Sequence, residues 1–83
     1  WVHFKLGDPQ KAVGYLERAT ELEPSDPEIT GHLGDVYWVL GRYDEARFKW
    51  RLALNLSADE EERAMLSARL KDGLAAKDVP VAN

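Results

Sequence analysis

The stretch His32–Ala46, HLGDVYWVLGRYDEA, decides the fold because it holds the end of one expected helix, a turn and the start of the next. Apolar residues recur at three- and four-residue steps up to Leu40, which is the pattern of a helix with one buried face. Gly41 then ends this helix, because glycine accepts a left-handed backbone conformation that other residues avoid. The sequence therefore predicts a helix over residues 27–40 and a second helix over residues 43–56.

Further helices are expected on both sides of this pair. An Asp-Pro step starts a helix over residues 8–22, because aspartate caps a helix and proline suits its first position. Ser57, with Glu60 three residues later, has the spacing of a capping box, which predicts a last helix ending near Ala75. A partial helix at the N-terminus brings the expected number to about five, and no sheet is expected.

The chain also repeats itself with a period of 34 residues. This shift places Leu6-Gly7 on Leu40-Gly41, and it superposes three further pairs: Ala12 on Ala46, Ala19 on Ala53, and Leu22 on Leu56. The identities fall on small and apolar positions with helical spacing, where packed repeats retain them.

The same residues resemble the tetratricopeptide repeat (TPR) family, whose 34-residue helix–turn–helix unit follows the pattern W-x2-L-G-x2-Y, A-x3-F, with a later Ala and a closing Pro. The residues that match this pattern are Gly7, Ala12, Ala19, Pro24, Leu33, Gly34, Tyr37, Gly41, Tyr43, Ala46, Trp50 and Ala53. Small residues at Gly34 and Ala46 would let the two helices of a hairpin approach closely.

The resemblance implies an all-α fold in which antiparallel helix hairpins stack as a right-handed superhelix. It divides the chain into a truncated first unit (residues 1–26), a complete unit (27–60), a capping helix (61–76) and a flexible tail (77–83). The chain would then be the C-terminal part of a longer TPR protein.

The resemblance also implies a non-catalytic scaffold that binds a peptide or protein segment in a concave groove. Carried over by position, the groove residues are Phe4, Lys5, Glu28, His32, Asp35, Trp38, Val39, Met65 and Arg69. Trp38 is open to two interpretations, a binding anchor or a packing residue. Two further functions are an accessory segment of a larger enzyme and a self-association module that dimerises through the open N-terminal hairpin.

The sequence gives little support for catalysis or for binding of a cofactor, a metal, nucleic acid or a membrane. The chain has no cysteine and no phosphate-binding glycine loop, so no cofactor and no catalytic residue is expected. His32 shares a helix face with Glu28 and Asp35, which could hold a metal, but a solvated polar face is the better interpretation. The net charge of −4 opposes nucleic-acid binding, and no apolar run is long enough to insert in a membrane. No targeting segment is visible, and the cytoplasm is the default compartment.

Overall fold

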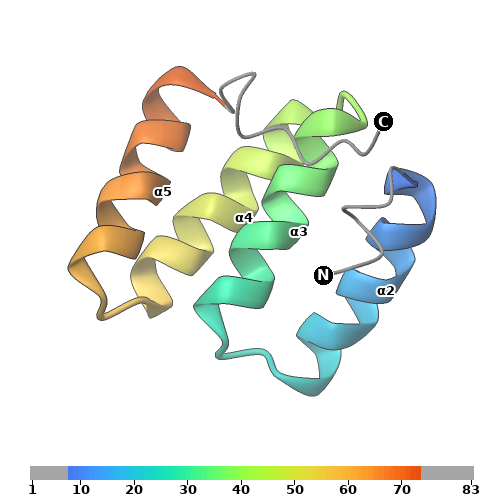
Figure 1. Ribbon diagram of the computed structural model, residues 1–83, viewed down its shortest axis with the longest axis horizontal. Helices are drawn as coiled ribbons and strands as arrows, with labels where there is room; N and C mark the ends of the chain where they lie inside the picture. The colour runs from blue at the N-terminus through green and yellow to red at the C-terminus, as the bar shows by residue number, and fades with distance from the viewer. Residues whose placement is uncertain (1–7, 74–83) are drawn as a thin grey trace.

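The computed structural model describes residues 8–73, which fold into four α-helices (Figure 1). With the labels of Figure 1, the helices are α2 (Pro9–Leu22), α3 (Pro27–Val39), α4 (Tyr43–Leu56) and α5 (Glu60–Asp72). The predicted all-α fold is confirmed, as are the three helix starts expected at residues 9, 27 and 43. The partial helix expected at the N-terminus and the tail expected over residues 77–83 lie outside the described residues.

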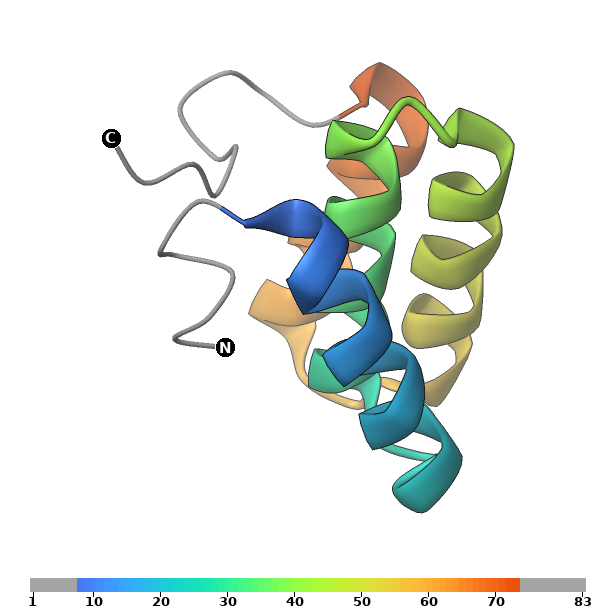
Figure 2. The same ribbon diagram turned by 90° about the vertical axis from the view of Figure 1, so that its right-hand side faces the viewer.

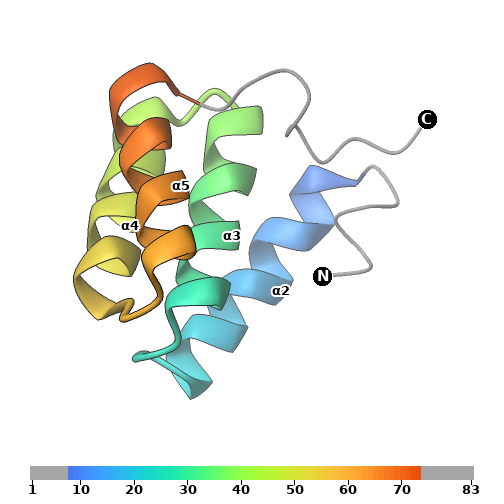
Figure 3. The same ribbon diagram turned by 60° about the vertical axis from the view of Figure 1, so that its left-hand side comes forward.

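The helices pack in chain order, each against the next, as antiparallel hairpins. In Figure 1, α2 and α5 lie at opposite ends of a row, with α3 and α4 between them. Figure 2 views this row from its α2 end, and Figure 3 shows α5 beside α3. Among the described residues, no helix has the length and apolar character needed to cross a membrane.

The helix starts follow the expected capping chemistry at two places and differ at a third. Asp8 and Asp26 accept hydrogen bonds from backbone N–H groups in the first turns of α2 and α3, as predicted. The capping box predicted for the last helix is wrong. Asp59 caps α5 instead, and the Ser57 hydroxyl donates a hydrogen bond of 2.5 Å to the Glu62 carboxylate.

Glycines with positive φ end two of the helices. Gly41 has a φ of 82° and turns the chain from α3 into α4, as the sequence predicts. Gly73 has a φ of 79° and ends α5 at Asp72, three residues before the predicted end near Ala75. A Cβ on Gly73 would lie 2.5 Å from the Trp38 ring, so glycine is also needed there for space.

The core is centred where α3 meets α4. Trp50 is fully buried and its ring lies directly on Gly34, where a Cβ would be 2.6 Å from the Trp50 Cδ1 atom. The same Cβ would be 3.0 Å from the Ala46 carbonyl oxygen, which confirms the predicted close approach of the two helices. The α2 side adds buried Ala12, Val13 and Leu16 to this core.

We predict opposite effects for alanine at two glycines. Gly34→Ala should lower the free energy of unfolding by up to about 2 kcal/mol, because a steric cost of about 1–3 kcal/mol outweighs the gain of about 1 kcal/mol in helix propensity. Gly14→Ala should raise it by about 0.5–1 kcal/mol, because Gly14 is exposed inside α2 and its Cβ would meet nothing within 4 Å. Urea denaturation measures both. Equal effects at the two positions would contradict the close approach at Gly34.

Candidate functional site

A shallow hollow of about 550 Å³ lies between α3 and the start of α5. It is lined by Glu28, His32, Asp59, Glu61, Glu62 and Met65. The structure thus brings together three residues assigned to the groove from the sequence, namely Glu28, His32 and Met65. Met65 is 42% exposed, so it offers an apolar contact inside an otherwise polar hollow.

The charge of the hollow is strongly negative because four of its six lining residues are carboxylates. Asp59 is engaged as the cap of α5, and Glu62 accepts the hydrogen bond from Ser57. Glu28 and Glu61 are exposed to solvent. The negative charge therefore comes from two carboxylates that are hydrogen-bonded at the start of α5, Asp59 and Glu62, and from two exposed carboxylates, Glu28 and Glu61.

His32 lies on the α3 side of the hollow, where its imidazole is 25% exposed. Its Nε2 atom is 3.9 Å from the Glu28 carboxylate, and its Nδ1 atom is 3.9 Å from the Asp35 carboxylate. Within residues 8–73, no group of three or more histidine, aspartate or glutamate side chains has the arrangement of a metal site.

Asp35 and Arg69, two predicted groove residues, instead belong to a polar network inside the protein. Asp35 is only 3% exposed, and its carboxylate accepts a hydrogen bond of 2.9 Å from the Trp50 indole N–H. An Arg69 Nη1 atom donates to both Asp35 oxygens at 3.0 and 3.1 Å. The expectation that Asp35 faces a ligand therefore does not hold, because neutralising its buried charge requires these partners.

Trp38 is a packing residue as well. Its ring centroid lies 4.4 Å from that of Tyr43 and 5.5 Å from that of Trp50, and its edge contacts Gly73 at the end of α5. The Arg47 guanidinium lies 5.1 Å from the Trp38 ring centroid. Of the two interpretations open from the sequence, this geometry favours packing.

The other predicted groove residues are placed as follows. Val39 is partly buried and packs against the core. Phe4 and Lys5 lie outside the described residues. The sequence analysis did not assign Asp59, Glu61 and Glu62 to the groove, because the capping box at Ser57 placed the start of the last helix too early. The run of acids at residues 59–62 is the signal that could have identified them.

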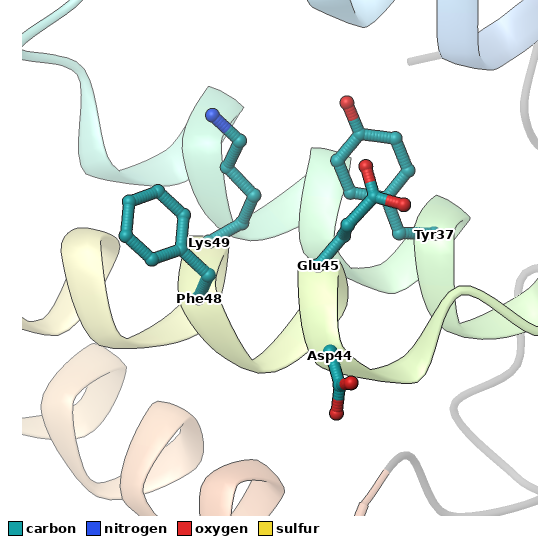
Figure 4. A pocket seen from close by; sticks show the side chains of 5 residues that line it. All are labelled: Tyr37, Asp44, Glu45, Phe48 and Lys49. Atoms are coloured by element: carbon teal, nitrogen blue, oxygen red, sulfur yellow. The ribbon is translucent and has the colours of Figure 1, made fainter.

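A second hollow, of about 400 Å³, is formed by Tyr37 on α3 and by four residues of α4 (Figure 4). Figure 4 shows the side chains of Glu45 and Lys49 on the same side as the Tyr37 hydroxyl, with Phe48 beside them and Asp44 pointing away. Phe48 is 62% exposed, and the Lys49 ammonium lies 5.6 Å from its ring centroid.

Tyr37, which lines this second hollow, contacts residues of α2 and of the turn before α4. The Tyr37 hydroxyl donates a hydrogen bond of 2.6 Å to Glu17 on α2, and the Arg42 guanidinium lies 4.3 Å from the Tyr37 ring centroid. Arg42 also donates two hydrogen bonds to Glu45, which lower the pKa of that carboxyl. The polar groups of Glu17, Tyr37, Arg42 and Glu45 are thus already engaged with one another. We therefore interpret this hollow as a place where helices are held together.

Comparisons with known proteins agree with this geometry. A sequence model of the tetratricopeptide repeat family matches residues 1–61. The chain is similar to cell division cycle protein 27 homolog A from Arabidopsis thaliana, with 32% identity over 66 residues. That match covers 80% of this chain and 9% of the relative's length. No solved structure gave a significant match.

We predict that Asp35 and Arg69 stabilise the fold as a coupled pair. Arg69→Met should lower the free energy of unfolding by about 3–5 kcal/mol, because it removes the guanidinium that pairs with the buried Asp35 charge. Adding Asp35→Asn should recover part of this loss, because the amide carries no charge and still accepts from Trp50. Urea denaturation followed by tryptophan fluorescence gives the coupling free energy. Strictly additive losses would contradict the pairing.

We also predict a loss of stability at high pH that is traceable to Tyr37. Burial, together with the hydrogen bond to Glu17, raises the pKa of Tyr37 from 10.0 to about 12. The unfolded chain therefore releases this proton first, so the free energy of unfolding falls as the pH rises from about 10 to about 12. Tyr37→Phe should lack this component in denaturation curves compared across that range. An unchanged pH dependence in Tyr37→Phe would assign the effect elsewhere.

Proposed function

The chain belongs to the tetratricopeptide repeat family, and we propose that it binds a segment of a partner protein in the hollow between α3 and α5. Members of this family are generally protein-interaction scaffolds and are typically non-catalytic. The observation that carries the proposal is the exposed Met65 set among carboxylates on two neighbouring helices. An apolar contact within a charged rim is the usual arrangement of a protein-binding surface.

The chemistry of the hollow favours a segment with a lysine or arginine next to an apolar side chain. Glu28 on α3 and Glu61 on α5 supply exposed negative charge, and Met65, one turn after Glu61, supplies the apolar surface. Methionine is flexible and polarizable, so it adapts to apolar side chains of several shapes. The charge sets the kind of partner and its rate of approach, while the apolar contact slows its release.

The position of α5 supports a role as the closing helix of the repeat. Leu66 is buried against α3, where a Cβ on Gly31 would lie 3.5 Å from the Leu66 Cδ2 atom. Arg63 donates hydrogen bonds to the Leu54 and Ser57 carbonyl oxygens and so satisfies the end of α4. Most of the remaining α5 residues are exposed, among them the polar Glu60, Ser67, Lys71 and Asp72, which suits a helix that separates a repeat from solvent.

Two glutamates in the first turn of α5 provide a matched test of the hollow. Glu61 lines the hollow whereas Glu60 does not, and both are exposed. The chain is first screened on an array of synthetic peptides of varied charge, and bound peptides are measured by fluorescence anisotropy. We expect the bound peptides to carry lysine or arginine. Glu61→Lys should weaken their binding about tenfold, because it removes an attraction and adds a repulsion.

Glu60→Lys is the control, since it makes the same charge change at the same helix end. It should leave peptide affinity within about twofold, apart from a small effect on the net charge. Met65→Ser should weaken binding strongly without unfolding the chain, because it removes an exposed apolar contact and adds no charge. Equal effects of Glu60→Lys and Glu61→Lys, or bound peptides without basic residues, would contradict the proposal.

A further inference from the structure

The outer face of α4 carries a large apolar side chain that lies outside the core. Phe48 is 62% exposed and stands at the edge of the second hollow, apart from the hydrogen bonds around Tyr37 (Figure 4). Asp44 is four residues before Phe48 and Arg51 is three residues after it, so the three side chains share one face of the helix. Asp44 and Arg51 are exposed as well, and neither forms an ion pair with any residue in the range 8–73. This face therefore presents an aromatic ring between an acid and a base that are both available for contact.

The internal repeat shows that neighbouring repeat units leave the position of Phe48 open. Gly14 on α2 lies 34 residues before Phe48, at the equivalent position of the repeat. Gly14 is exposed although α3 and α4 follow it, and among the described residues its Cβ would meet nothing within 4 Å. Phe48 is likewise exposed although α2 and α3 precede it and α5 follows it. The exposure is therefore a property of this position in the repeat, and it does not depend on where the chain begins or ends.

Arg51 differs in charge from its equivalent in the first unit. That equivalent is Glu17, which accepts the hydrogen bond from Tyr37 on the following helix, α3. Moving both positions by 34 residues gives Arg51 on α4 and Lys71 on α5, which are two cations and repel each other. This polar link between neighbouring helices is therefore lost at Arg51, which is exposed on the surface of α4.

We propose that a second copy of the chain binds to this face, with the two α4 helices antiparallel across a twofold axis. Asp44 and Arg51 lie almost equally far from Phe48 along the helix, one on each side of it. A twofold axis at Phe48 therefore brings the two phenyl rings into contact and places each Asp44 beside the Arg51 of the other copy. The order of acid, aromatic ring and base is complementary to itself only when one helix is reversed. This charge complementarity is the reason to expect a second copy as the partner.

The contact between the two copies is small. Each copy contributes one helix of 14 residues, which is about 21 Å long. A contact of this size buries less than the roughly 1,200 Å² of a standard interface, so we expect a reversible dimer with a dissociation constant on the order of 10–100 μM. The inference does not depend on the function proposed for the hollow between α3 and α5.

The test exchanges charges between the copies and follows the dimer by sedimentation equilibrium at about 10–500 μM chain. Asp44→Arg and Arg51→Asp should each weaken the dimer about tenfold or more, because the twofold axis places two repelling pairs in every variant dimer. An equimolar mixture of the two variants should restore the dimer, since position 44 of one copy again faces the opposite charge at position 51 of the other. Asp72→Arg makes the same charge change at an exposed residue of α5 and should leave the dissociation constant within about twofold.

Phe48→Ser tests the aromatic contact, and circular dichroism confirms that each variant is folded. Because Phe48 is exposed, its replacement should weaken the dimer about tenfold or more without unfolding the chain. A chain that stays monomeric at about 500 μM would overturn the proposal and leave this face to a different partner. A dimer that Phe48→Ser leaves unchanged would overturn it too, as would two charge variants that stay monomeric when mixed. All these variants should bind the basic peptides normally in the hollow between α3 and α5, so the two proposals fail independently.

Discussion

The packing of the Trp50 indole against Gly34 is the contact on which the rest of the structure depends. The ring is fully buried, and it occupies the volume that any Cβ at position 34 would need. Its N–H group is directed at Asp35, one residue further along α3, so the same ring is fixed by both shape and a hydrogen bond. Because Gly34 brings the backbones together, α3 and α4 pack closely enough to enclose a side chain as large as tryptophan.

This contact also determines where α5 lies. Asp35 turns its buried charge toward Arg69, which is the repeat-equivalent position 34 residues later. The buried carboxylate therefore requires a cation, and Arg69 supplies it from a helix one repeat further along the chain. A buried ion pair contributes little net stability compared with an apolar pair, but it penalises arrangements that leave one charge without its partner. We infer that Asp35 and Arg69 select the placement of α5 rather than add to the strength of its packing. The hollow beside Met65 exists because α5 is held in that place.

The sequence predicts the helices better than it predicts the surface. The positions of α2 and α3 follow from local signals, since Asp-Pro steps start both helices and Gly41, with positive φ, separates α3 from α4. The start of α5 does not follow from the local sequence, because Ser57 and Asp59 both suit a cap. In the structure Asp59 is the cap, and the Ser57 hydroxyl donates to Glu62 instead. Asp35 and Trp38 could not be assigned from helix periodicity, because both stand on the same side of α3 that later helices cover. Charge suggests exposure for Asp35, and its buried hydrogen bonds contradict that. Size leaves Trp38 open to an anchor or a packing residue, and the neighbouring rings favour packing.

The surface proposed for binding between α3 and α5 is related to the repeat in two ways. In the hollow between α3 and α5, equivalent positions retain the acid, with Glu28 in one helix and Glu62 in the next. The pair Gly31 and Met65 is also equivalent, but there the repeat changes from a packing glycine to an exposed side chain. The repeat thus retains the acidic residue of this surface, whereas the apolar contact, Met65, is a residue that differs between the repeats. The surface proposed for binding between α3 and α5 therefore lies where the repeat keeps the helix but replaces a packing glycine by a larger, exposed side chain.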